Sequence, residues 1–196
     1  MSAKQKSPGG HEQSVQERSV KRSRREPAEV AIEDTGDVLL DTDTLLLKVS
    51  SAVLIHALKV LRRELLGAFK EGVEFRKNGE ITLDHCDDNG ESMLLICKIL
   101  YNRCGQMPPP SPDELKRLWI HCDKYDCVHT VAPICKQWLR ALVHRERNRL
   151  ERSRAAADNT EIDIMLALAC RFESAEIFRD ASATMILRLE GSPLNY

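Results

Sequence analysis

A stretch near the middle of the chain, residues 91–102, predicts a helix that is apolar around most of its circumference. Its apolar side chains are Met93, Leu94, Ile96, Cys97, Leu100 and Tyr101. A helix at the surface of a protein carries only one apolar stripe, so a helix that is apolar on most sides has to be buried. The sequence therefore predicts a central helix, around which the remaining elements must be arranged.

The segments before this helix predict a small sheet with two helices. Residues 38–40 and 44–49 form two apolar runs joined by the turn residues 41–43, a pattern typical of a hairpin. Residues 80–84 alternate between polar and apolar side chains and predict a third strand. Ser50 or Ser51 can cap a helix over residues 52–57, and a second helical stretch over residues 61–69 is expected to end at Gly72.

The segments after the central helix predict mainly helices. Residues 105–112 are rich in proline and predict a loop, with a polyproline ligand as the less favoured interpretation. The next helix has one apolar face, formed by Leu115, Leu118, Trp119, Cys122 and Tyr125. A further helix is expected from about residue 130, with Pro133 in its first turn. Residues 143–157 are rich in arginine and predict a continued helix or a linker, and two last helices are expected at residues 161–171 and 174–190. These elements together predict the α+β class.

Charge is unevenly distributed along the 196 residues, although 29 Lys and Arg nearly balance 30 Asp and Glu. Residues 1–29 hold seven basic and four acidic side chains and almost nothing apolar, so they predict a disordered basic tail. Within this tail, Lys21, Arg22, Arg24 and Arg25 predict a nuclear-import signal. The commoner interpretation of such a run is a solubilising tail.

Composition excludes several classes of protein. The net charge of −1 counts against a dedicated nucleic-acid binder. No apolar run reaches the roughly 18 residues of a membrane span, and the first residues do not predict a secretory signal. We therefore expect a cytoplasmic or nuclear protein with reduced cysteines, and an odd number of cysteines, seven, excludes a complete disulfide framework.

One group of residues suggests a zinc site. It consists of His121, Cys122, Cys127, His129 and Cys135. Zinc needs four ligands that converge tetrahedrally, whereas neighbouring residues of a helix point about 100° apart, so no metal is expected. The favoured alternative is that cysteines are buried as small apolar side chains, which we expect at Cys97, Cys122, Cys135 and Cys170.

Motifs of catalysis are lacking in the sequence. It contains no P-loop, GxGxxG or GxSxG pattern, and the pairing of Cys127 with His129 is too common to indicate a nucleophile and its base. Asp87 and Asp88 lie in a predicted turn, where accepting backbone N–H groups would explain them. We expect no enzymatic activity and no cofactor.

Several short sequence motifs, in order and at characteristic spacing, resemble the BTB/POZ domain. The resemblance is closest to the BTB proteins of filamentous fungi. The motifs are Gly36-Asp37-Val38, residues 47–54, Leu66-Gly67-Ala68-Phe69 with Glu71-Gly72, Glu80-Ile81-Thr82-Leu83, Ile99-Leu100-Tyr101, Cys122-Asp123-Lys124-Tyr125-Asp126-Cys127 and Trp138-Leu139. The resemblance covers about residues 36–142. It implies a small sheet flanked by a cluster of helices over residues 30–142, and residues 158–190 look like the helical extension that follows this domain in the fungal proteins.

This resemblance implies a homodimerising adaptor without catalytic activity, which also binds an unidentified protein partner. In the family, the first helix and the first strand form the two-fold interface. The corresponding residues here are Asp37, Val38, Leu40, Val53, Leu54 and Ala57.

Two departures from the family bear on the alternatives. The transcription-repressor branch carries a basic residue where this chain has Ser51, which counts against a charged pocket for corepressors. Members that recruit a cullin ubiquitin ligase often have an acidic residue where this chain has Leu95, which counts against a substrate adaptor of that kind. The third alternative is a nuclear regulatory factor whose tail and arginine run, residues 140–154, contact nucleic acid; solvated arginines are the favoured interpretation of that run.

Overall fold

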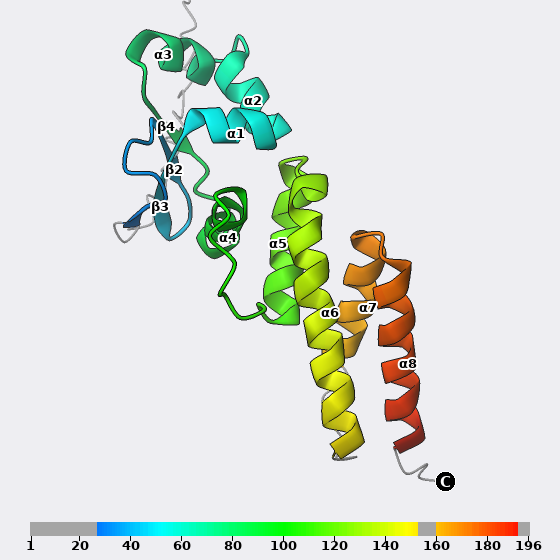
Figure 1. The fold of residues 1–196 in the computed structure, drawn as a ribbon. Helices are drawn as coiled ribbons and strands as arrows, with labels where there is room; N and C mark the ends of the chain where they lie inside the picture. Colours follow the sequence, from blue (N-terminus) through cyan, green and yellow to red (C-terminus); the bar gives the residue numbers. More distant parts are fainter. Residues whose placement is uncertain (1–26, 153–159, 192–196) are drawn as a thin grey trace, which may run out of the picture.

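The predicted hairpin is the centre of a four-stranded sheet in the computed structural model, which describes residues 27–152 and 160–191 (Figure 1). Strands β2 (Val38–Asp41) and β3 (Leu45–Val49) run antiparallel, with Leu40 opposite Leu47. β4 (Ile81–Asp84) lies parallel to β2, and β1 (Ala28–Ala31) lies parallel to β3, so the order is β1-β3-β2-β4. Alternate residues of β2 and β3 are buried, so one face of the sheet covers the core.

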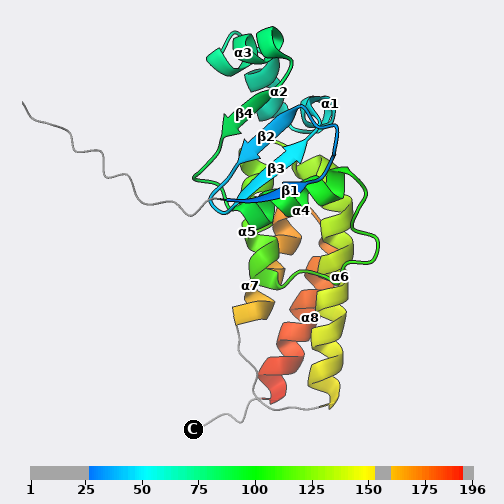
Figure 2. The same cartoon turned by 90° about the vertical axis from the view of Figure 1, so that its left-hand side faces the viewer.

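Helix α4 (Gly90–Leu100) is the buried helix that the sequence predicts. Met93, Ile96 and Cys97 are fully buried, and the helix packs against β3 on one side and against α5 and α6 on the other. Figure 2 shows it directly behind the sheet. The expectation of a central helix is confirmed, and the described residues fold as a mixed α+β protein.

Three helices lie at the end of the sheet opposite the helical extension (Figure 1). They are α1 (Ser51–Ala57), α2 (Lys59–Leu66) and α3 (Lys70–Asn78). The sequence predicted a helix that ends at Gly72, but the helix breaks at Gly67 and a separate helix α3 runs through Gly72. Gly72 lies against the end of α2, and a Cβ there would approach the carbonyl oxygens of Gly67 and Glu64 to 2.7 and 2.8 Å. The glycine thus marks a close contact between helices, which sequence alone cannot distinguish from a helix end.

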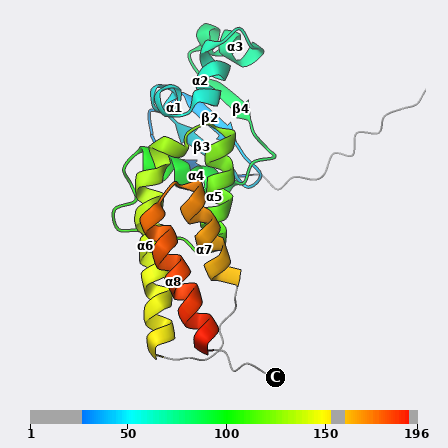
Figure 3. The ribbon, with the colours of Figure 1, turned by 90° about the vertical axis from the view of Figure 1, so that its right-hand side faces the viewer.

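The described residues after position 111 form a bundle of four helices. They are α5 (Pro112–Lys124), α6 (Val128–Arg152), α7 (Thr160–Arg171) and α8 (Ala175–Gly191). Ser111 and Glu114 form a capping box at the start of α5. Helices α7 and α8 match the two predicted at the end of the chain, and they pack on α5 and α6 respectively (Figure 3).

Two predicted boundaries differ from the structure. Strand β1 begins at Ala28 and therefore includes two residues of the tail expected to be disordered over residues 1–29; residues 1–26 lie outside the described residues. Helix α6 begins at Val128 and continues without a break to Arg152, so Pro133 stands inside the helix and not in its first turn. Residues 143–152 continue this helix, which is one of the two predicted alternatives. Residues 153–157 of the arginine-rich segment lie outside the described part of the chain.

In the described parts of the chain, no helix combines the length and the apolar character that crossing a membrane would require.

We predict that Gly72→Ala destabilises the protein by about 1–3 kcal/mol, because the methyl group would overlap backbone oxygens that cannot move independently. An alanine inside an otherwise unconstrained helix would instead stabilise it by about 1 kcal/mol. Urea unfolding measures the difference, with Gly105→Ala as the control, since a Cβ at Gly105 meets nothing within 4 Å. Equal stability of Gly72→Ala and the wild type would contradict the close packing of α2 and α3.

Candidate functional site

The residues expected to form a dimer interface separate into two groups. Val38, Leu40 and Leu54 are completely buried within the chain, so the expectation that they contribute to an exposed interface is wrong. Val38 and Leu40 point from β2 into the core, and Leu54 lies on the inner side of α1. Strand alternation places Val38 and Leu40 on one face of β2, but it cannot tell whether that face is covered by the rest of the chain.

Val53 and Ala57 lie on the outer side of α1 and are half-buried. With Ala52, His56, Ile99, Leu100 and Thr130 they line an open depression of about 450 Å³ between α1, the end of α4 and the start of α6. None of these seven side chains carries a permanent charge. The depression is therefore a mainly apolar surface, which two of the six predicted residues line.

Asp37 has a structural role at the start of α1. Its Oδ1 accepts the backbone N–H of Ser51 at 2.6 Å, and its Oδ2 accepts the Ser51 hydroxyl at 2.6 Å. A carboxylate at the N-terminus of a helix satisfies a free N–H group and interacts favourably with the helix dipole. Asp37 directly precedes β2, so its two hydrogen bonds fix the start of α1 to this strand. They thereby position Val53 and Ala57 on α1.

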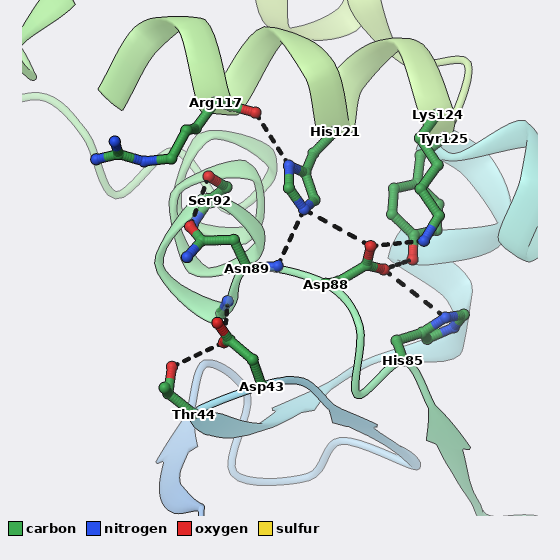
Figure 4. Close-up of polar contacts among 11 residues, drawn as sticks. Asp43, Thr44, His85, Asp88, Asn89, Ser92, Arg117, His121, Lys124 and Tyr125 are labelled. Carbon is green, nitrogen blue, oxygen red and sulfur yellow. Dashed lines mark hydrogen bonds and ion pairs between the residues drawn. The ribbon is translucent and has the colours of Figure 1, made fainter. Parts of the chain in front are cut away.

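The strongest polar cluster of the described residues surrounds Asp88, in the loop between β4 and α4 (Figure 4). Asp88 is only 3% exposed. Lys124 of α5 donates to its Oδ1 at 2.5 Å, and the hydroxyl of the fully buried Tyr125 donates to its Oδ2. We call Asp88, Lys124 and Tyr125 the Asp88 centre. It holds the loop against α5, whereas the sequence predicted that Asp88 accepts backbone N–H groups; that prediction is wrong.

Asn89, and not Asp87 or Asp88, caps the N-terminus of α4. Its side chain accepts the backbone N–H of Ser92 in the first turn of α4 at 3.0 Å. Asp87 is exposed. A buried tyrosine hydroxyl needs an acceptor. The predicted burial of Tyr125 therefore indicates a buried acceptor near it, but it does not indicate which residue supplies that acceptor.

Burial and hydrogen bonding shift the pKa values of Asp88 and Tyr125. Burial alone would raise the pKa of Asp88, but the hydrogen bonds from Lys124 and Tyr125 and the nearby charge of Lys124 hold it below its usual value. Burial and the bond to Asp88 raise the pKa of Tyr125. Asp88 is therefore ionised and Tyr125 is protonated at neutral pH, which is the arrangement their hydrogen bond requires.

Two histidines lie beside Asp88. The Nε2 of His121 accepts the backbone N–H of Asn89 at 3.1 Å, and its Nδ1 lies 3.0 Å from the carbonyl oxygen of Arg117. Because a carbonyl oxygen only accepts, this pattern assigns the proton to Nδ1. The Nδ1 of His85 lies 3.9 Å from Oδ2 of Asp88. The Nε2 of the same ring lies 3.6 Å from Oε2 of Glu64 on α2. The cluster thus links α2, α4 and α5.

The residues of the suspected zinc pattern do not all come together. Cys122 and Cys127 are buried and hydrogen-bonded to each other, and the buried Cys135 lies near them, whereas His129 is exposed and His121 accepts the N–H of Asn89. In the residues that the structure describes, no group of three or more His, Cys, Asp or Glu side chains is placed to hold a metal ion.

Burial makes most of these thiols unreactive. It raises the pKa of both Cys97 and Cys135 to about 12, and a hydrogen bond to Cys127 together with burial raises that of Cys122. A thiol with a raised pKa is a poor nucleophile. The expectation that cysteines are buried holds at Cys97, Cys122 and Cys135, but it is wrong at Cys170, which is exposed on α7.

Three arginines of the run form ion pairs. Arg140 bonds to Glu176 at 2.8 Å, Arg147 to Glu151 at 3.2 Å and Arg149 to Glu146 at 2.6 Å. Arginines engaged in this way offer less charge to phosphate groups. The predicted import signal at Lys21, Arg22, Arg24 and Arg25 lies outside the described residues.

No family model matches the chain, and no curated protein is similar to it in sequence.

We predict that Asp37→Ala lowers the free energy of unfolding by about 1.5–3 kcal/mol, because two hydrogen bonds to a charged group are lost. Asp37→Asn, which keeps an acceptor for the Ser51 N–H, should lose less. Chemical unfolding of both variants measures this order. If Asp37→Ala were as stable as the wild type, the proposed anchoring of α1 would be wrong.

We predict that Asp88→Asn costs about 3 kcal/mol at neutral pH, because it leaves Lys124 and Tyr125 without a buried carboxylate. The pKa of Asp88 is lowered in the folded state, so its contribution is present above the unfolded value of about 3.9 and is lost as the pH falls through the folded value. Unfolding curves at several pH values should therefore show the wild type and Asp88→Asn converging in acid. Asp87→Asn is the control, and a difference independent of pH would contradict an ionised Asp88.

Proposed function

We propose that the protein is a homodimerising interaction module of the BTB/POZ type, without catalytic activity, that serves as an adaptor in the cytoplasm or nucleus. The observation that carries the proposal is the mainly apolar depression at α1, where Val53 and Ala57 lie beside Ile99 and Leu100. An apolar surface without permanent charges is typical of the core of a homodimer interface.

The order of elements supports the BTB/POZ type. The resemblance implies a hairpin, a helix pair, a strand, a buried helix, a loop and a further helix pair. The chain has β2 and β3, then α1 and α2, then β4 beside β2, the buried α4, and α5 with α6. Helix α3 (Lys70–Asn78) does not occur in this order, and it packs against the end of α2 at Gly72.

The surroundings of α1 support the two-fold interface that the resemblance implies. Asp37 anchors the first turn of α1 through Ser51, and the Tyr101 hydroxyl accepts the N–H of Ser50 at 2.8 Å. The helix thus presents Ala52, Val53 and His56 from a fixed position. Preorganised surfaces bind with a smaller entropic cost.

The alternatives receive less support. Leu95, which stands where cullin-binding members carry an acidic residue, is only 9% exposed and offers no charge to a partner. The ion pairs of Arg140, Arg147 and Arg149 reduce the positive potential that a nucleic-acid contact would use.

We predict that the full chain is a dimer across about a hundredfold range of concentration, measured by light scattering during gel filtration. Ala52→Glu places a charge in the depression and should convert the dimer to a folded monomer, because a buried unpaired charge is costly. Helix stability is preserved, since an acidic residue suits the first turn of a helix.

Ala141→Glu is the matched control, since Ala141 is exposed on α6 and does not line the depression. It should remain dimeric. A monomeric wild type would overturn the proposal, and a dimeric Ala52→Glu would place the interface on another surface.

A further inference from the structure

A second apolar surface lies where α2 ends and α3 begins, at the end of the molecule farthest from the helical extension (Figure 1). Leu66, Phe69 and Val73 are 53%, 61% and 54% exposed. We call these three residues the α2–α3 tip. Single exposed apolar residues are ordinary, but three large ones within eight positions form a patch of the kind that marks an interaction site.

The tip has a defined conformation. The N–H of Val73 donates to the carbonyl oxygen of Phe69 at 3.1 Å, which places Phe69 at the start of α3. The Phe69 ring lies over Gly67, whose Cβ, if present, would be 3.1 Å from the ring carbon Cδ2. Arg76 donates to the carbonyl oxygen of Gly67 at 3.1 Å and joins α3 to the end of α2. The three apolar side chains are therefore presented from a structured corner.

Basic side chains flank the tip at helical spacing. Arg62 precedes Leu66 by four residues on α2, and Lys70 and Lys77 stand three residues before and four residues after Val73 on α3. Residues three or four apart lie on the same side of a helix. All three basic side chains are exposed, so each helix presents positive charge beside an apolar side chain.

The acidic residues of the same segment are directed elsewhere. Glu64 lies 3.6 Å from His85 in the cluster around Asp88. Glu71 is close enough to Glu64 to raise the pKa of that carboxyl, although burial is the larger cause. Glu74 lines a groove on the open face of the sheet, together with Leu39 and Lys48. The margin of the tip is consequently dominated by positive charge.

We propose that the α2–α3 tip docks an acidic amphipathic helix of a partner protein. Apolar side chains of that helix would cover Leu66, Phe69 and Val73, and its flanking carboxylates would face the basic residues. Apolar and basic side chains alternate at one-turn spacing, which fits a facing helix, whereas binding to a bilayer uses a broader apolar face. The tip shares no residue with the depression at α1, so the proposal does not depend on dimerisation.

Fluorescence anisotropy tests the proposal with the full chain and a labelled helical peptide that has leucines along one face and glutamates on the others. We expect saturable binding that weakens with salt. Phe69→Ser should reduce the affinity about tenfold, since truncated anchors in an interface lose at least this much. Lys70→Glu should also weaken binding and reduce its salt dependence.

Ile120→Ser is the matched control, because Ile120 is 49% exposed on α5 and lies away from the tip. Ile120→Ser should bind like the wild type. The fold and thermal stability of Phe69→Ser, measured by circular dichroism and thermal unfolding, should match those of the wild type. A scrambled peptide of the same composition should bind weakly.

Three outcomes would overturn the proposal. One is the absence of saturable binding to the amphipathic peptide, and another is equal affinity of Phe69→Ser and the wild type. The third is sedimentation of the wild type with vesicles of phosphatidylserine and phosphatidylcholine that is lost in Phe69→Ser, which would assign the tip to a membrane surface.

Discussion

The rest of the structure depends on the buried carboxylate of Asp88. A carboxylate with so little exposure has to be paired and hydrogen-bonded, because its desolvation is otherwise prohibitive. Lys124 and Tyr125 meet this requirement from the end of α5. The loop that leads from the sheet into the central helix is thereby fixed to the helical bundle.

The same loop is held from the hairpin side. The carboxylate of Asp43, in the turn between β2 and β3, accepts the N–H of Gly90 at 2.7 Å, and the backbone N–H of Asp43 donates to the carbonyl oxygen of Asp88 at 3.0 Å. A side chain at Gly90 would collide with the hydroxyl of Thr42. These contacts hold the start of α4 in place against the hairpin. The other end of α4 carries Ile99 and Leu100, which line the depression at α1.

The depression at α1 and the α2–α3 tip are apolar surfaces that differ in their charge. The depression at α1 is nearly uncharged, as suits association with an identical chain. The α2–α3 tip is bordered by basic residues, as suits a partner of opposite charge. The proposed adaptor function needs two surfaces that can be occupied together, and the depression at α1 and the α2–α3 tip share no residue.

Periodicity in the sequence determined the hairpin, the buried α4, the apolar face of α5 and the last two helices, because apolar spacing is a local property. It did not determine which of those apolar residues remain at the surface. Val53 lines a surface while Leu54, its neighbour, is buried, and Gly72 marks a contact where a helix end was predicted. The partners of Asp88 are 36 and 37 residues away. Only the tertiary structure could decide these points, because burial, close approach and the pairing of charges depend on segments that are distant in sequence and meet only in the fold.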